Sequence, residues 1–191
     1  MRLVTIVEGH GDYEAAPILI RRILYELLAV SNIEVLRPIR IPRSKLLRSG
    51  ELERAVRLGR AMTSDGDVVL VLIDANSDCP AELAPKLLTR ASSVASDRQT
   101  RVVLAKREFE AWFIAGAPSL SGRRGLPAGL TAPSDVEVIA DAKGWLSSLM
   151  AVNKTYRETL DQAALSALVD LNLARNAPSF DKLVRVLSSI F

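Results

Sequence analysis

The sequence has one cysteine, Cys79, and one histidine, His10. A single cysteine cannot form a disulfide within the chain, and one cysteine with one histidine cannot build a zinc site of those residue types. The longest strongly apolar run, residues 68–73, is far too short to span a bilayer. No basic segment followed by an apolar stretch opens the chain. We therefore expect a cytoplasmic protein with no membrane segment.

Several familiar nucleotide and nucleophile motifs are also missing. Gly9-His10-Gly11 begins like a dinucleotide-binding loop, but Glu14 occupies the position of the third glycine. A Walker A sequence is absent, so the chain predicts no ATPase of its own. No serine lies in a nucleophile elbow, and a histidine-based triad could use His10 alone. These classes of enzyme are set aside.

The composition of the 191 residues is typical of one globular domain, with 49% hydrophobic and 25% charged residues. The net charge of +3 is mildly basic. This value is too small to indicate nucleic-acid binding without a local concentration of positive charge.

Four apolar, β-branched runs alternate with amphipathic segments along the first two thirds of the chain. The expected strands are residues 3–7, 33–41, 67–74 and 100–104, and the expected helices are residues 12–30, 51–62, 81–95 and 108–115. Strands without polar alternation, separated by helices, predict an α/β fold with a four-stranded parallel sheet covered on both faces.

The composition changes after this alternating part. Residues 117–133 are rich in Gly, Pro, Ser and Arg and predict a long loop. Helical patterns follow at residues 136–150, 159–172 and 179–190. We expect an α/β core over 1–116, the loop over 117–133, and a helical C-terminal region over 134–191 that packs on the core as part of one structural unit.

Acidic residues follow three of the expected strands. Glu8 ends the first, Asp74 ends the third with Asn76 and Asp78 close behind, and Glu108 follows the fourth. Ligands of open parallel sheets bind beyond the carboxyl ends of the strands, and Mg²⁺ uses carboxylate oxygens with water. This pattern predicts a metal site. Taken one at a time, these residues can equally be solvated turn or cap residues.

Two other acidic residues have open roles. Asp12 is better explained as a helix cap than as a ligand. Glu110 lies two residues after Glu108, about 200° around a helix, so both cannot face one ion. The sequence does not choose between these two glutamates. The expected metal ligands are Glu8, Asp74, Asn76, Asp78 and Glu108.

Positive charge is concentrated between residues 37 and 60, where eight basic residues face two acidic ones. Two further arginines lie in the expected loop. The candidate phosphate-binding residues are Arg37, Arg40, Arg43, Lys45, Arg48, Arg123 and Arg124. Few aromatic residues are available to stack on bases, and a solvated basic surface explains the same pattern.

The segments "VEG" and "DANSD" resemble the TOPRIM domain of topoisomerases, primases and OLD-type nucleases. Five blocks in order resemble more closely a family of small prokaryotic TOPRIM-like proteins that occur beside AAA/OLD-type ATPases in putative phage-defence loci. The blocks are "IVEGHGDYEAAPILIRRI", "LVLIDANSDCPAEL", "KREFEAWFIAG", "DAKGWLSSLM" and "ARNAPSFDKLVRVL".

The resemblance implies phosphodiester cleavage of DNA or RNA with Mg²⁺ or Mn²⁺, in partnership with such an ATPase. Glu8 would be an acid/base or a ligand, and Asp74 and Asp78 would be ligands. The TOPRIM pattern has Asp-x-Asp, whereas Asn76 occupies the second position here. A neutral amide holds a second ion less strongly, so the alternative is a non-catalytic module that binds nucleic acid or an ATPase and keeps a vestigial acidic site.

Overall fold

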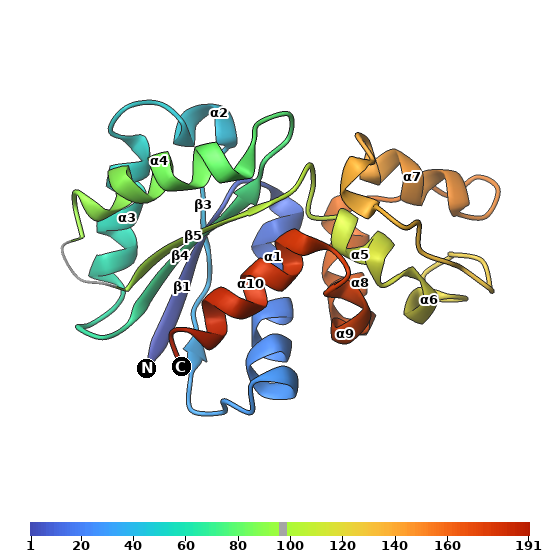
Figure 1. Ribbon diagram of the computed structural model, residues 1–191, viewed down its shortest axis with the longest axis horizontal. Helices are drawn as coiled ribbons and strands as arrows, with labels where there is room; N and C mark the ends of the chain where they lie inside the picture. The colour runs from blue at the N-terminus through green and yellow to red at the C-terminus, as the bar shows by residue number, and fades with distance from the viewer. Residues whose placement is uncertain (96–98) are drawn as a thin grey trace.

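The computed structural model describes residues 1–95 and 99–191, which form an α/β fold around a parallel sheet (Figure 1). The strands run in the order β2-β1-β4-β5, and β3 also pairs with β1. Their bounds are Arg2–Val7 (β1), Glu34–Val35 (β2), Ile39–Arg40 (β3), Val68–Asp74 (β4) and Thr100–Ala105 (β5). The expected α/β class and the parallel sheet are confirmed.

The sheet has five strands rather than the expected four, because the segment 33–41 forms two short strands. Val35 pairs with Leu3, and Ile39 pairs with Ile6 farther along β1. Pro38 lies in the interruption, where its ring removes the main-chain donor that a continuous ladder would need.

One face of the sheet is covered by α2 (Arg43–Leu46), α3 (Glu51–Ala61) and α4 (Pro80–Ser92). Val4 and Ile6 of β1 point into this layer with Val69 and Val71 of β4. The neighbouring residues point to the opposite face, because side chains alternate along a strand. Helix α2 lies in a segment for which the sequence predicted no helix.

The opposite face carries α1 (His10–Arg22) and α10 (Pro178–Ser188), and the remaining C-terminal helices lie beyond α1 (Figure 1). Helix α1 continues as a π-helix, Ile23–Leu27, and ends earlier than the expected residue 30. Asp12 lies in the first turn, and Gly9 is the residue that precedes the helix. The expected helix 81–95 corresponds to α4, which ends at Ser92.

The C-terminal region is built from shorter helices than the sequence predicted. They are α5 (Ala111–Ala115), α6 (Ala117–Leu120), η2 (Val136–Val138), α7 (Ala142–Leu149), η3 (Glu158–Gln162), α8 (Ala163–Leu168) and α9 (Leu171–Ala174). Helix α6 occupies the start of the expected loop. The expected helices 136–150 and 159–172 are each interrupted, and the helix expected from residue 108 begins at Ala111.

One hydrophobic cluster joins these helices to the sheet, which fixes the C-terminal region against the core. Trp112 and Phe180 are buried in it with their rings 5.4 Å apart, and the Trp112 indole donates a hydrogen bond to Ser179 Oγ at 2.8 Å. Arg22 of α1 donates to the carbonyl of Val169 at 2.7 Å. In the described residues, no helix is both long and apolar enough to cross a membrane.

Candidate functional site

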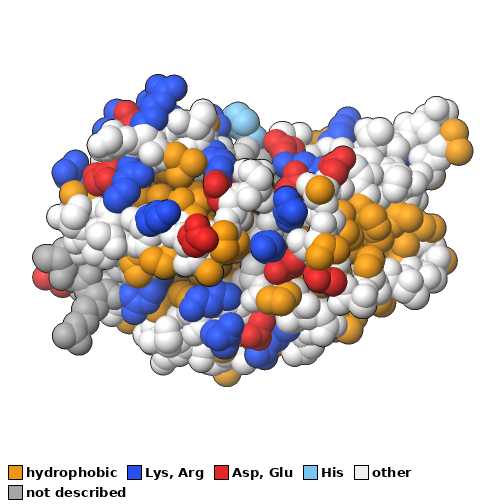
Figure 2. All heavy atoms as spheres, turned by 45° about the horizontal axis from the view of Figure 1, so that its top comes forward, with side chains coloured by type: hydrophobic (Ala, Val, Ile, Leu, Met, Phe, Trp, Pro, Cys, Tyr) orange, Lys and Arg blue, Asp and Glu red, His pale blue; other side chains and the backbone are white. Residues whose placement is uncertain are grey.

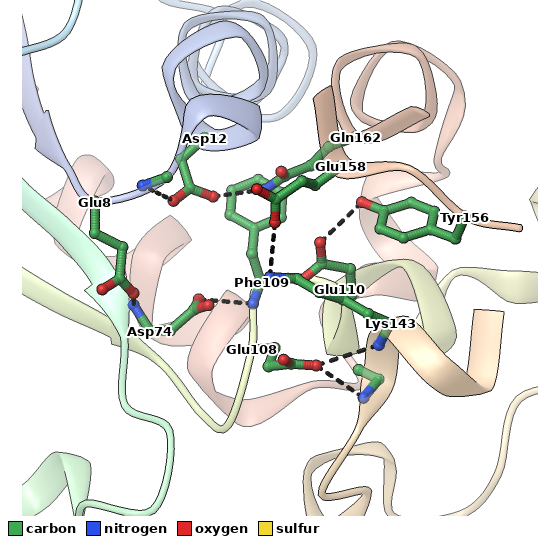
Figure 3. Close-up of polar contacts among 12 residues, drawn as sticks. Glu8, Asp12, Asp74, Glu108, Phe109, Glu110, Lys143, Tyr156, Glu158 and Gln162 are labelled. Atoms are coloured by element: carbon green, nitrogen blue, oxygen red, sulfur yellow. Dashed lines mark hydrogen bonds and ion pairs between the residues drawn. The ribbon is translucent and has the colours of Figure 1, made fainter. Parts of the chain in front are cut away.

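Glu8 and Asp74 meet at the carboxyl ends of two adjacent parallel strands, β1 and β4 (Figure 3). The Asp74 N–H donates a hydrogen bond to Glu8 Oε1 at 2.9 Å. Asp74 Oδ1 accepts the Phe109 N–H at 2.8 Å, and the Asp74 side chain is buried. One oxygen of each carboxylate is therefore fixed by the main chain, as the strand ends of a parallel sheet allow.

Asp12 lies beside them in the first turn of α1 and links the site to the C-terminal region. Its Oδ2 accepts the Gly9 N–H at 2.8 Å, and its Oδ1 accepts the Gln162 side-chain amide at 2.6 Å (Figure 3). Asp12 thus stabilises the start of the helix as expected, but from the third helical residue. Its second bond ties α1 to η3 across 150 positions of sequence.

Glu110 is fully buried on the same side of the sheet. Tyr156 donates its hydroxyl to Glu110 Oε1 at 2.8 Å, while Glu110 Oε2 has no hydrogen-bond partner in the described residues. Burial raises the pKa of Glu110 to about 7, against the opposing effects of Lys143 and Tyr156. Burial also raises the pKa of Tyr156, and Glu110 adds to that rise.

Lys143 supplies positive charge to these carboxylates. Its Nζ donates to Glu158 Oε2 at 2.9 Å, and Figure 3 shows Lys143 beside Glu110. Burial lowers the pKa of Lys143, but Glu110, Glu158 and Asp74 outweigh burial and raise it overall. The ammonium group is therefore held in its charged form.

Negative charge still exceeds positive charge here. Burial raises the pKa of Asp74 well above its ordinary value, and the nearby carboxylates of Asp12, Glu110 and Glu8 raise it further. The pKa of Glu8 is also raised, first by burial. We call Glu8, Asp12, Asp74 and Glu110, together with Lys143, the acidic site.

The other expected metal ligands have different surroundings. Asp78 is half exposed and is ion-paired with Arg43, which also donates to the carbonyl of Asp74. Asn76 is exposed, with a positive φ of 51°, and its N–H donates to the Arg107 carbonyl at 2.8 Å. Glu108 Oε2 accepts the Ala142 N–H at 2.9 Å, at the start of α7.

The structure therefore joins Glu8 to Asp74 and turns Asp78 toward an arginine. Of the two glutamates after β5, Glu110 is the one buried with the acidic charges, whereas Glu108 caps a helix. Across residues 1–95 and 99–191, no three Asp, Glu, His or Cys side chains converge as a ready-made set of metal ligands.

The basic residues lie on two separate segments. Arg40 is exposed at the end of β3, and the Ile41 N–H donates to the Val7 carbonyl at 2.9 Å, so this segment borders Glu8. Arg37, Lys45 and Arg48 are also exposed, whereas Arg43 is engaged with the loop after β4. In the C-terminal region Arg123 is exposed and Arg124 is ion-paired with Asp161 at 2.9 Å.

Sequence reasoning did not identify Lys143, Tyr156, Glu158 and Gln162 as part of the site. They come from α7, from η3 and from the residues before it, which packing brings back to the sheet. Lys143 lies in "DAKGWLSSLM", a block that the sequence comparison singled out but to which no role was given. That block was the one available signal.

The comparisons with known proteins place the chain in a family. A family model described as a domain of unknown function, DUF4276, matches residues 7–188, so the chain belongs to this family. No curated protein and no solved structure gave a significant match.

Proposed function

We propose that the chain is the divalent-metal-dependent nuclease component of an ATPase-linked phage-defence system, and that it cleaves phosphodiester bonds of DNA or RNA in the cytoplasm. The observation that carries this proposal is the contact of Glu8 with Asp74 at the carboxyl ends of β1 and β4, inside a region of excess negative charge. Crowded carboxylates destabilise a fold unless a cation or a chemical role compensates them.

The donor atoms suit Mg²⁺ or Mn²⁺. Glu8 Oε2 and Asp74 Oδ2 receive no hydrogen bond within the described residues, and both are hard oxygen donors. Mg²⁺ commonly binds one or two carboxylates and completes its shell with water and substrate phosphate. Glu8 and Asp74 would therefore hold the ion, and the absence of a third converging carboxylate is compatible with that type of site.

Such an ion supplies a bound water of lowered pKa and positive charge at the scissile phosphate. Asp74 is positioned for its role by the Phe109 N–H. Glu8 is held through Oε1, which leaves Oε2 to take or return a proton at the reacting oxygen. Lys143 keeps the surrounding carboxylates from repelling an anionic substrate, because its charge offsets theirs.

The substrate would cross the acidic site between two basic segments. Arg37 and Arg40 lie near the end of β1, and Arg123 lies in the C-terminal region. Arginines on both sides can neutralise phosphates on either side of the scissile bond. Arg43 is better explained as a positioning residue, because it bonds the main chain that follows β4.

One observation favours a second candidate function, a non-catalytic module that binds nucleic acid or an ATPase. Asp78, expected as a ligand, is ion-paired with Arg43 instead. Asn76, which replaces the second acidic residue of the TOPRIM pair, is exposed in a left-handed turn. A site reduced to Glu8 and Asp74 holds a single ion more readily than the two ions of many phosphoryl-transfer enzymes.

The first experiment measures cleavage of supercoiled plasmid and of a single-stranded oligonucleotide, with Mn²⁺ and with EDTA. We expect nicking with Mn²⁺, none with EDTA, and a loss of about 100-fold or more in Glu8→Gln. Glu34→Gln is the matched control, since Glu34 is exposed on β2 at the opposite end of the sheet. This control should retain wild-type activity.

A calorimetric titration of Mn²⁺ separates the two candidate functions. The nuclease proposal requires binding to wild type that Asp74→Ala removes. If wild type binds nucleic acid but neither cuts it nor takes up Mn²⁺, alone or with its ATPase, the module is the correct description. Circular dichroism of each variant establishes that the fold is retained.

A further inference from the structure

Strand β5 lies at an edge of the sheet and pairs on one side with β4. The hydrogen bonds to β4 use alternate residues of β5, because the Ala75 N–H donates to the Ala105 carbonyl at 2.7 Å. The register places Val71 opposite Val102 and Ile73 opposite Leu104. The N–H and C=O groups of Val102 and Leu104 therefore point away from β4.

These outward groups have no hydrogen-bond partner among the described residues. Unpaired N–H and C=O groups along an edge strand are a template for another strand, and natural proteins usually block such edges with a charge, a proline or a covering element. Here α4 and α10 flank β5 on its two faces and leave its edge between them (Figure 1).

A groove of about 660 Å³ runs along this edge between α4 and α10. We call it the edge groove. Its apolar wall includes Leu88, whose side chain is 38% exposed, so an apolar surface remains open to solvent. Representative lining residues are Ala84, Leu88, Val102, Leu104, Lys106 and Lys182. On the part of the molecule that carries the sheet, Figure 2 shows apolar side chains in a hollow bordered by Lys and Arg.

The charge around the edge groove is positive. Lys106 and Lys182 line it and form no ion pair with the described residues. Arg185 also lines the groove and shares its charge with Asp181 of the same helix. The acidic lining residue, Glu137, is engaged by the Ser179 N–H at 2.7 Å. An occupant would therefore meet two lysines whose charges are uncompensated.

We propose that the edge groove binds an extended, acidic segment of a partner protein, which adds to β5 as a further strand of the sheet. The outward groups of Val102 and Leu104 would supply the main-chain hydrogen bonds. Apolar side chains of the segment would pack against α4, and its carboxylates would contact Lys106 and Lys182. This inference does not depend on the nuclease activity proposed above.

The chemistry of the groove selects this occupant over two others. A nucleic acid would match the lysines but not the apolar wall or the unpaired strand groups. A second copy of the chain would match the strand, but pairing two β5 edges would bring Lys106 and Lys182 of both copies together. Like charges that face each other across an interface disfavour association.

The test measures binding of labelled peptides of about eight residues to the full chain by fluorescence anisotropy. The probe alternates valine with glutamate. One comparison peptide replaces each glutamate by lysine, and another keeps the glutamates but replaces each valine by proline, which removes main-chain donors. We expect the first peptide to bind about tenfold more tightly than either comparison.

Charge reversal in the groove tests the contacts. Lys106→Glu combined with Lys182→Glu should weaken binding of the acidic peptide about tenfold and favour the lysine peptide. Lys86→Glu is the matched control, because Lys86 is exposed on α4 but does not line the edge groove. This control should bind like wild type.

Hydrogen exchange at the Val102 and Leu104 amides identifies strand addition. Both amides should be protected when the acidic peptide is bound. Binding without this protection would overturn the proposal, as would equal binding of the proline peptide or no binding of any peptide. Displacement of the peptide by an oligonucleotide would assign the groove to nucleic acid. A concentration-dependent dimer that blocks the peptide would assign it to a second copy.

Discussion

The two ends of β4 hold aspartates in opposite electrostatic situations. Asp67, just before the strand, is buried, yet its pKa is lowered. Burial acts to raise it, but the N–H groups of Ser64 and Arg2 and the Arg2 guanidinium outweigh burial, with the Arg2 N–H at 2.7 Å and its Nε at 3.0 Å. Asp74, at the other end, is equally buried, and its pKa is raised well above its ordinary value.

The difference lies in the partners that the fold provides. Asp67 has an arginine of its own, whereas Asp74 shares Lys143 with Glu8, Glu110 and Asp12. Charge compensated at the amino end stabilises the fold, while charge crowded at the carboxyl end opposes it. Departures from local stability concentrate at functional sites. The carboxyl end is also where open parallel sheets bind ligands.

The largest effect should appear when the same substitution is made at both ends. Asp67→Asn removes the charge that Arg2 pairs with and should lower the free energy of unfolding by about 2 kcal/mol at pH 7. Asp74→Asn should cost little or raise stability in EDTA, because it removes a crowded carboxylate. Urea unfolding at pH 7 measures both values.

The two variants should also differ in their response to metal. Millimolar Mn²⁺ should raise the melting temperature of wild type and of Asp67→Asn, but not that of Asp74→Asn. An equal loss of stability from the two substitutions would show that the crowding at the carboxyl end carries no energetic consequence, and the comparison would fail.

Glu110→Gln isolates one member of the crowded end. Glutamine keeps an oxygen that can accept the Tyr156 hydroxyl and removes the charge. The folded-state pKa of Glu110 is about 7 and its ordinary value is 4.5. A carboxyl whose folded pKa is raised favours folding when protonated, so wild type loses stability as the pH rises from about 4.5 to about 7.

The variant should therefore be less sensitive to pH over that interval. Its stability relative to wild type should increase from pH 4.5 to pH 7 and stay constant above, because Glu110 is then ionised in both folded and unfolded wild type. Urea unfolding in EDTA at several pH values measures the difference. A difference that does not change with pH would contradict the raised pKa.

The sequence was sufficient to predict the sheet and one pair of the acidic site. Strands β1, β4 and β5 are continuous β-branched runs, and such runs have few structures open to them other than buried parallel strands. Glu8 and Asp74 followed from their places at strand ends. That inference needs the strand direction alone, and no knowledge of distant packing.

The rest of the site depends on long-range packing that periodicity does not encode. Asp12 meets Gln162, and Glu110 meets Tyr156, because η3 and the preceding residues fold back onto α1 and α5. The choice between Glu108 and Glu110 was decided by α7, whose start takes Glu108 as a cap. The turn that pairs Asp78 with Arg43 joins segments 35 residues apart.

A third carboxylate, Glu53 of α3, extends the comparison to a compensated charge outside the sheet. Arg90 of α4 donates to Glu53 Oε1 at 2.7 Å and to Oε2 at 2.9 Å. This pairing lowers the pKa of Glu53 to about 2 from an ordinary value of 4.5. A carboxyl whose folded pKa is lowered contributes stability above its unfolded pKa and loses it as the pH falls.

Glu53→Gln should therefore destabilise the chain by about 1 kcal/mol at pH 7, a modest value because the pair lies near solvent. The difference from wild type should shrink as the pH falls from about 4.5 toward about 2, the opposite direction to Glu110→Gln. Arg90 also donates to the carbonyls of Leu47 and Arg48, so Arg90→Gln should cost more than Glu53→Gln. A double-mutant cycle separates the ion pair from those carbonyl bonds. A coupling energy near zero at pH 7 would show that solvent screening cancels this pair, and that compensated charge stabilises the fold only where it is buried, as at Asp67.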